Sequence, residues 1–203
     1  MENDAIRYAY IARNKKHTEC ILYESHLTYT IILPGRENPA THSASYSDIL
    51  KIHLSKPDIG WYGMDIHLKN GQRLHFKNLA FYRVENNKMR RVKVNQEDNR
   101  YVAAVSNSYL AFVLALHKRI WENGLAENTV LSYGSTLYKL FILAAILVTG
   151  AIILPMAFQF SSVGRILFFI TAALLLIFFY FKIDFKRKYR VDHIPLSYIP
   201  VAR

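Results

Sequence analysis

Two long apolar stretches near the C-terminal end, Leu140 to Phe160 and Ile166 to Phe181, constrain this 203-residue chain more than any other feature. The first contains no charged residue and, at about 1.5 Å rise per residue, is long enough to cross a hydrocarbon core of about 30 Å. The second is shorter, but Arg165 and Lys182 at its ends can extend to the two interfaces. The sequence therefore predicts a transmembrane hairpin of two helices over residues 137–183.

Basic residues near these stretches predict the orientation of the hairpin. The turn between the stretches carries Arg165 alone, whereas several Lys and Arg follow the second stretch, and such residues accumulate on the cytoplasmic side. Glu2, Asp4 and Arg7 interrupt the start of the chain, which argues against a cleaved secretory signal. We therefore expect a multi-pass membrane protein with both termini cytoplasmic.

The net charge of +11 is concentrated in the same part of the chain. Residues 137–203 hold 8 Lys and Arg against 2 Asp and Glu, which accounts for +6 of the total. Basic residues beside a membrane span are attracted to anionic lipid, so we interpret the excess in this way and expect no nucleic-acid partner. Cys20 is the only cysteine, which excludes an intramolecular disulfide and a Cys-rich zinc site.

The pattern predicts five regions. They are an N-terminal segment (1–17), a β-rich domain (18–124), a linker (125–136), the hairpin (137–183) and a cytoplasmic basic tail (184–203). Within the domain, short β-branched and aromatic runs separated by turn residues predict strands at 19–23, 27–33 and 46–54, with a loop at 34–43. In the third of these strands, alternation places Leu50, Ile52 and Leu54 on one face.

The segment around Asn70-Gly71 allows a prediction of strand register. A two-residue turn would mix polar and apolar residues on both faces of the hairpin formed by 61–68 and 72–76. A three-residue loop with Gly71 in the left-handed conformation instead pairs Ile66 with Leu74 and Met64 with Phe76. That register segregates the polar residues on the opposite face, so we favour it. Those residues are Asp65, His67, Arg73 and His75.

A further hairpin is predicted from 81–84 and 92–94, and a helix from 106 to 123. Ser106 or Ser108 can cap the helix and Gly124 can end it. Apolar residues at three- and four-residue spacing predict one buried helix face, formed by Tyr109, Phe112, Val113, Leu116 and Ile120. The tail after residue 184 contains apolar residues that suit docking, and the sequence leaves open whether it docks or is disordered.

A run of antiparallel hairpins followed by one amphipathic helix resembles the pleckstrin-homology-like domains of bacterial membrane proteins. The resemblance covers about 18–123, and the helix segment containing Tyr109, Phe112, Leu116, His117 and Arg119 is similar to the closing helix of that family. It implies an antiparallel β-barrel closed by the helix, and a binding or scaffolding role without catalysis. The first turn, 23–26, is short and acidic, which departs from the basic loop of phosphoinositide-binding members.

The polar hairpin face, to which His53 can be added, has three interpretations. Histidines with a carboxylate can bind zinc and activate water, which would suit a hydrolase that uses Asp65 and His67. The same residues could bind an anion or a partner. They could also be polar because they face solvent, and no HExxH-type spacing directs two imidazoles toward one point. We favour the solvated face and expect neither a metal nor a catalytic residue here.

Basic residues are the strongest candidates for contact with a lipid or partner. The densest run in the β-rich domain lies at 83–100, and a second run follows the hairpin. We select nine residues, which are Arg83, Lys88, Arg90, Arg91, Lys93, Lys186, Arg187, Lys188 and Arg190.

We predict an α+β protein in which the pleckstrin-homology-like barrel precedes the hairpin. The resemblance implies that it is a multi-pass protein of a bacterial inner (cytoplasmic) membrane. Its function is expected to be a non-enzymatic interaction module, without a cofactor, that binds a protein partner or anionic lipid at the membrane. The alternative is an accessory subunit of a multi-subunit envelope or transport complex. The sequence leaves open the partner, the lipid and whether the chain forms a homo-oligomer.

Overall fold

The computed structural model describes residues 5–34, 39–58, 60–85, 88–93, 96–135, 144, 169–171, 174 and 186–201. The chain divides into two units. The first unit is discontinuous, because it combines Met1–Tyr133 with Lys188–Arg203, and the second unit is Gly134–Arg187. The site and the pocket described below lie in the first unit.

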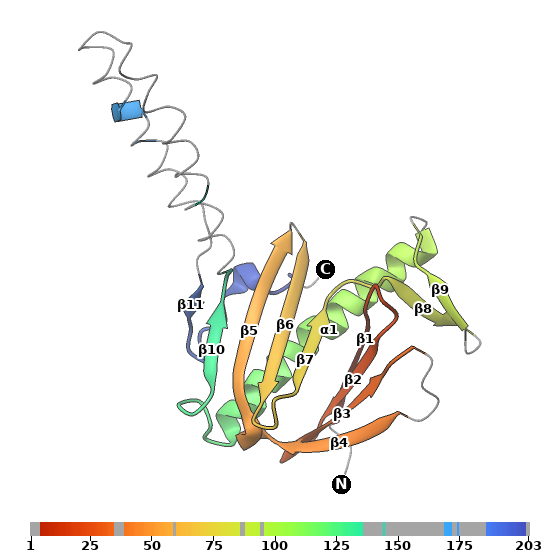
Figure 1. Ribbon diagram of the computed structural model, residues 1–203, viewed down its shortest axis with the longest axis horizontal. Helices are drawn as coiled ribbons and strands as arrows, with labels where there is room; N and C mark the ends of the chain where they lie inside the picture. Colours follow the sequence, from red (N-terminus) through yellow and green to blue (C-terminus); the bar gives the residue numbers. More distant parts are fainter. Residues whose placement is uncertain are drawn as a thin grey trace. The chain divides into compact units, whose positions relative to one another are not determined.

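Four antiparallel strands in sequential order form the first sheet (Figure 1). They are β1 (Ile6–Ile11), β2 (His17–Leu22), β3 (His26–Ile32) and β4 (Ala40–Ser45). Their alternation directs Tyr8, Cys20, Leu27 and Tyr29 into the core, where each is at most 3% exposed. Strands β2 and β3 confirm the strands predicted at 19–23 and 27–33. The structure also adds β1, which lies in the predicted N-terminal segment, and β4, part of which was predicted as loop.

The 3-10 helix η1 (Tyr46–Asp48) leads from the first sheet to the second. The second sheet has the order β11-β10-β5-β6-β7. Its strands are β5 (Ile49–Asp58), β6 (Trp61–Leu68), β7 (Arg73–Lys77), β10 (Val130–Tyr133) and β11 (Arg187–Lys188). Strand β10 pairs with β5 in parallel, with Leu131 opposite Ile52, so part of the predicted linker is a strand.

The predicted register of the β6–β7 hairpin is confirmed. Ile66 pairs with Leu74 and Met64 with Phe76. Gly71 has a φ of 81°, the left-handed conformation that a three-residue loop requires. The face predicted for β5 is wrong at its start, because the register shifts between Ile49 and Lys51. This irregularity buries Ile49 and leaves Leu50 48% exposed.

Helix α1 (Gln96–Glu122) follows the short hairpin of β8 (Tyr82–Glu85) and β9 (Lys88–Arg91). The predicted apolar face is confirmed, because all five of its residues are fully buried. The helix ends where Gly124 was expected to end it. The amide of Gly124 donates to the carbonyl of Trp121, and that of Leu125 donates to Ile120, both at 3.0 Å.

The core lies between the two sheets and α1. The ring of Tyr8 on β1 contacts those of Phe76 on β7 and Tyr109 and Phe112 on α1, with centroid distances of 5.5 to 5.9 Å. Aromatic pairs at this spacing add stability beyond their buried area. One aromatic cluster therefore joins both sheets to the helix. Strands β1 to β9 precede the helix, as the resemblance implies, but β10 and β11 of the second sheet follow it.

The prediction of a closed barrel is wrong. Among the described strands, those of the first sheet pair only with one another, and so do those of the second. Strands β1 and β7 approach each other, but the contact there is made by the Tyr8 hydroxyl, which donates to the carbonyl of Lys77 at 2.6 Å. A closed barrel would need backbone hydrogen bonds between β1 and β7. A side-chain hydrogen bond is found there instead, so the two sheets stay open.

The prediction of a membrane protein with a two-helix hairpin is also wrong, and with it the multi-pass inner-membrane location. In the part of the chain that the structure describes, no helix is both long and apolar enough to cross a membrane. Helix α1 has the length, but it is apolar on one face only and has charged residues in its first and last turns. The predicted span 137–183 itself lies outside the described residues, except for 144, 169–171 and 174.

Candidate functional site

Polar side chains gather on one face of the second sheet. Successive residues of a strand point to opposite faces, and the residues directed toward α1 are apolar and buried. The residues on the other side form a surface that we call the outer face. Its members are Lys51, His53, Asp65, His67, Arg73, His75, Lys77 and Ser132.

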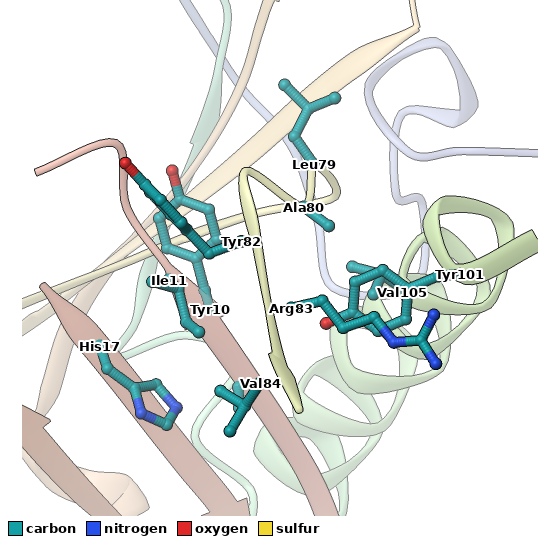
Figure 2. A pocket seen from close by; sticks show the side chains of 11 residues that line it. Tyr10, Ile11, His17, Leu79, Ala80, Tyr82, Arg83, Val84, Tyr101 and Val105 are labelled. Carbon is teal, nitrogen blue, oxygen red and sulfur yellow. The ribbon is translucent and has the colours of Figure 1, made fainter. Parts of the chain in front are cut away.

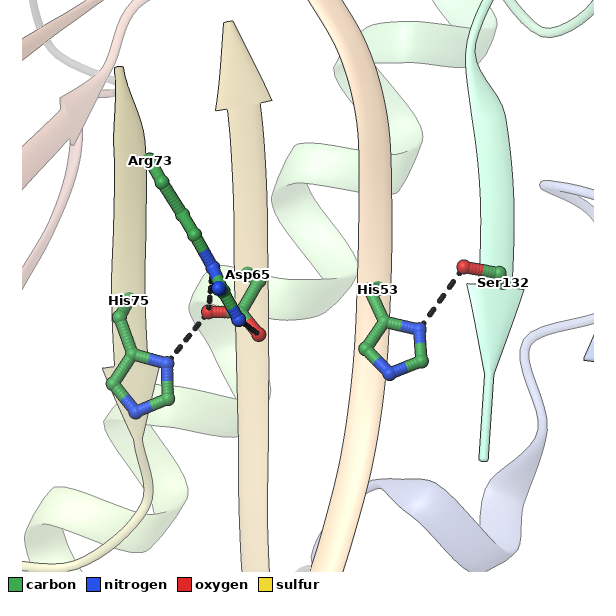
Figure 3. Close-up of polar contacts among 5 residues, drawn as sticks. All are labelled: His53, Asp65, Arg73, His75 and Ser132. Carbon is green, nitrogen blue, oxygen red and sulfur yellow. Dashed lines mark hydrogen bonds and ion pairs between the residues drawn. The ribbon is translucent and has the colours of Figure 1, made fainter. Parts of the chain in front are cut away.

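Strand register places members of the outer face opposite one another on adjacent strands, in rows that we call rungs. Ser132, His53, Asp65 and His75 lie opposite one another on the adjacent strands β10, β5, β6 and β7. Figure 3 shows their side chains on the same side of the sheet, with α1 behind it. The predicted polar face therefore exists, and β10 contributes Ser132, which the sequence analysis did not include.

Asp65 is the centre of the outer face. Its carboxylate is 4% exposed. Arg73 donates to it through Nε at 3.2 Å and through Nη2 at 2.8 Å, and His75 donates through Nδ1 at 2.6 Å. Burial alone would raise the pKa of Asp65, but the hydrogen bonds and charges of His75 and Arg73 outweigh burial and hold this pKa well below its usual range. Asp65 is therefore ionised and balanced by its neighbours.

His53 and Ser132 form the other contact in this rung. Nδ1 of His53 lies 3.0 Å from the Ser132 hydroxyl. Ser132 is only 1% exposed, so a substrate could not reach this hydroxyl. The Asp65 carboxylate is held by two donors of its own hairpin. In this arrangement the Ser132 hydroxyl is not an accessible nucleophile, and the Asp65 carboxylate already accepts from Arg73 and His75.

The zinc interpretation also lacks a ligand set. Within the described residues, no three His, Cys, Asp or Glu side chains are placed to hold a metal ion. The outer face instead presents cations around one neutralised acid. At strand positions 51–55, 63–67 and 73–77, Lys51, Arg73 and Lys77 carry positive charge, and Asp65 is the one acidic residue.

The predicted basic run is divided between two roles. Strand pairing places Arg83 opposite Arg90. Arg83 donates to Glu97 at 2.8 Å and Arg90 donates to Asp98 at 2.6 Å, so both fasten the β8–β9 hairpin to the first turn of α1. The remaining residues described there, Arg91 and Lys93, are exposed. The side chain of Lys88 lies outside the described residues.

The C-terminal basic residues Lys186, Arg187, Lys188 and Arg190 are all exposed, and Arg190 pairs with Asp192 at 3.2 Å. Lys188 lies on β11, the neighbour of β10 in the second sheet, whereas the β8–β9 hairpin lies at the other end of α1 (Figure 1). The structure therefore does not bring these two basic groups together. A role of the nine residues in contact with a lipid or partner stays a prediction.

The tail contains a contact that the sequence analysis missed. His117 on α1 is only 2% exposed. Its Nδ1 donates to the Val113 carbonyl at 2.7 Å, so its Nε2 must accept from the Tyr189 hydroxyl, also at 2.7 Å. Burial lowers the pKa of His117 to about 4. Tyr198 and Ile199 are also buried, so the tail docks on the domain.

Comparisons with known proteins place the chain in no family. Neither a protein-family model nor a curated protein sequence matches it. Two solved structures are similar over part of their length. The hSac2 domain from the human phosphoinositide phosphatase Sac2 shares 11% identity over 66% of this chain and 80% of that chain, with a TM-score of 0.38. The Spt16D Pob3N heterodimer shares 13% identity over 67% and 58%, with a TM-score of 0.28.

Proposed function

We propose that this chain is a non-enzymatic binding module whose outer face holds an acidic segment of a protein partner. The observation that supports this proposal is the state of Asp65. Because Arg73 already neutralises this carboxylate and His75 donates a hydrogen bond to it, the one acidic group of the outer face does not repel an anionic partner. Complementary charge then favours an acidic segment and speeds its association.

The construction of the outer face supports the same proposal. Its residues stand on paired strands, which hold side chains more rigidly than loops do. Adjacent strands are spaced about 4.8 Å apart, so the cations form a grid on which several carboxylates can be placed at once. The ion pair with Asp65 fixes the direction of Arg73, whose side chain is 60% exposed. An arginine that is already oriented loses less entropy when a ligand binds.

A polyglutamate peptide with a fluorescent label is the probe that tests this function. We expect saturable binding, measured by fluorescence anisotropy, that weakens as salt is raised, because salt screens charges at a surface. Lys51→Glu and Lys77→Glu together should reduce the affinity at least about tenfold. Lys118→Glu is the matched control, since Lys118 lies on α1 and is 73% exposed. The control should bind as the unchanged chain does.

Anionic lipid is the competing partner. Binding to vesicles of phosphatidylcholine, with and without phosphatidylserine, distinguishes a lipid partner from an acidic protein segment. We expect the peptide to bind the chain, and we expect phosphatidylserine to increase vesicle binding only slightly. Strong binding to the serine vesicles without binding to the peptide would replace the protein partner by a lipid. Peptide binding that the double substitution leaves unchanged would overturn the role of the outer face.

A second candidate is a subunit of a larger assembly, which the exposed side of α1 favours. No Asp, Glu, Lys or Arg occurs between Arg100 and Lys118, although this stretch has several exposed positions, including Ala104 and Ala111. Leu114 and Trp121 are 45% and 57% exposed on the same helix. Charged residues are depleted in the centres of protein interfaces, and Trp is enriched there. Light scattering of the purified chain and of its Leu114→Glu variant tests whether this side mediates self-association.

A further inference from the structure

A pocket of about 230 Å³ lies where β1, β2, β8 and α1 meet, apart from the outer face. Figure 2 shows the side chains that surround it. Its apolar walls come from Ala9, Ile11, Leu79, Ala80, Val84 and Val105. Its remaining lining residues are Tyr10, His17, Tyr82, Arg83 and Tyr101. A cavity with apolar walls and a few polar groups is the usual form of a small-molecule site.

Two of the uncharged polar side chains in the lining, those of Tyr101 and His17, come from different elements. Tyr101 of α1 directs its hydroxyl toward β8, beside Arg83, and His17 extends from β2 on the other side of the view (Figure 2). Nε2 of His17 is buried and has no hydrogen-bond partner among the described residues. Burial lowers the pKa of His17, which favours the neutral ring. Glu19 and Arg7, the charged groups that face this ring from β2 and β1, act in opposite directions.

The charges of the lining restrict what the pocket can hold. Arg83 is its one formal cation, and the Arg83 guanidinium already pairs with Glu97 and lies 5.3 Å from the centre of the Tyr101 ring. No carboxylate belongs to the lining residues. An anion would therefore lack an uncompensated cation, and a cation would lack a counter-charge. Because burying an unpaired charge is costly, both classes of ligand are disfavoured.

The size of the pocket restricts the ligand further. Sites for drug-sized ligands have volumes of about 300 to 1,000 Å³, and this pocket is smaller. The apolar walls suit a flat hydrocarbon body. A hydroxyl group can both donate and accept a hydrogen bond, so it can satisfy Tyr101 or His17 whichever proton each carries.

We propose that this pocket binds a neutral, single-ring molecule with one hydroxyl group. The ring lies between Ile11, Val84 and Val105, and the hydroxyl meets the Tyr101 hydroxyl and the His17 imidazole. Strand β8 forms one wall, and its hairpin is fastened to α1 by the pair of Arg83 and Glu97 and by the buried pair of Arg90 and Asp98. The pocket therefore has walls that exist before the ligand arrives.

Three probes of similar shape test this proposal, namely p-cresol, p-xylene and 4-hydroxybenzoate. The full chain, labelled with ¹⁵N, is titrated with each, and amide shifts of Ala9, Ala80 and Val84 are followed. We expect saturable shifts with p-cresol. The affinity for p-xylene should be at least about tenfold lower, because the buried polar groups stay unpaired, and 4-hydroxybenzoate should also bind more weakly, because it is an anion.

Two variants and a control locate the binding. Val84→Trp should fill the pocket and abolish the amide shifts. Because Val84 is 51% exposed, the larger side chain should leave the fold intact. Val130→Trp is the matched control at an exposed position of β10 and should bind p-cresol normally. Tyr101→Phe should lower the affinity for p-cresol about tenfold, or about 1.4 kcal/mol, and leave the affinity for p-xylene unchanged.

The proposal is overturned by any of three outcomes. The first is the absence of saturable shifts with p-cresol in a chain whose spectrum shows that it is folded. The second is binding that persists in Val84→Trp, which would place the ligand elsewhere. The third is equal affinity for p-cresol and p-xylene, which would remove the role of Tyr101 and His17.

Discussion

Asp65 and Asp98 are both buried carboxylates held by an arginine, yet their surroundings differ. Asp65 lies on a sheet, and its partner Arg73 has a side chain that is 60% exposed. Asp98 lies in the first turn of α1, is fully buried, and its partner Arg90 is 34% exposed. Asp98 also accepts from the backbone amide of Lys93 at 2.8 Å. One pair therefore stands at a surface, whereas the other fastens two parts of the chain together.

The difference shows that the same ion pair can serve binding or architecture. Arg73 can reach solvent or a ligand while it stays paired, so its pair is compatible with a recognition surface. Arg90 has less access to solvent and connects β9 to α1. A two-stranded hairpin such as β8–β9 is marginal by itself, so its position depends on such contacts. Four predictions test this comparison.

Asp98→Ala should have the largest effect. It leaves Arg90 and the Lys93 amide without the carboxylate that holds them, and removal of one partner of a buried pair costs about 3 to 5 kcal/mol. Urea denaturation measures this loss, and hydrogen exchange at 82–91 should rise as the hairpin detaches. A loss of unfolding free energy below about 1 kcal/mol would show that the pair of Asp98 and Arg90 contributes no more than an ordinary surface ion pair.

The pH dependence of stability should distinguish the contribution of His117 from the contributions of Asp65 and Asp98. Its pKa falls from 6.5 to about 4 on folding, so the unfolded chain takes up the proton first. Stability that is present above pH 6.5 should therefore be lost as the pH falls toward 4, by on the order of 3 kcal/mol at 1.36 kcal/mol per pKa unit. Denaturation at a series of pH values measures the slope. His117→Gln removes the titrating group and should flatten the curve in this range.

Asp65→Asn should cost about 1.5 to 3 kcal/mol, the usual contribution of a hydrogen bond to a charged group. This is less than for Asp98, because Arg73 can be hydrated when it loses its partner. The pKa of Asp65 is lowered on folding, so its contribution is present above about pH 3.8 and is lost at lower pH. The stabilities of the variant and the unchanged chain should therefore converge in strong acid. A constant difference would show that the carboxylate charge is not responsible.

Glu97→Gln should have the smallest effect. Glu97 pairs with Arg83, but its side chain is 70% exposed, and exposed pairs contribute about 0 to 1 kcal/mol. The variant therefore serves as the matched control for Asp98→Ala, because both substitutions change an acid in the first turn of α1. Equal losses in the two variants would remove the distinction between them.

Local pattern was sufficient for the parts of the fold that depend on neighbouring residues. The register of β6–β7 follows from Gly71 and from the segregation of apolar side chains. The buried face and the end of α1 follow from spacing and from Gly124. The polar residues of the outer face were identified for the same reason, since Asp65, Arg73 and His75 alternate on one hairpin.

The missed features depend on distant or unusual contacts. Strand β1 alternates as well, with Tyr8 and Tyr10 buried, and this signal was overlooked near the start of the chain. The irregularity at Ile49 arises where η1 leads into β5, which alternation cannot reveal. Strand β10 pairs in parallel with a strand far away in sequence. The beginning of α1 at Gln96 depends on Asp98 and its contacts with the preceding hairpin.

The discontinuity of the first unit has a consequence for synthesis of the protein. His117 and Tyr189, which contact each other in the finished domain, are 72 residues apart. At about 5 to 20 residues per second, the ribosome makes Tyr189 roughly 4 to 14 s after His117. During this interval His117 and Tyr133 lack the contacts that Tyr189 makes with them in the finished domain. A chaperone that binds nascent chains therefore has a period of seconds in which it can contact His117 and Tyr133, before the tail docks on the domain.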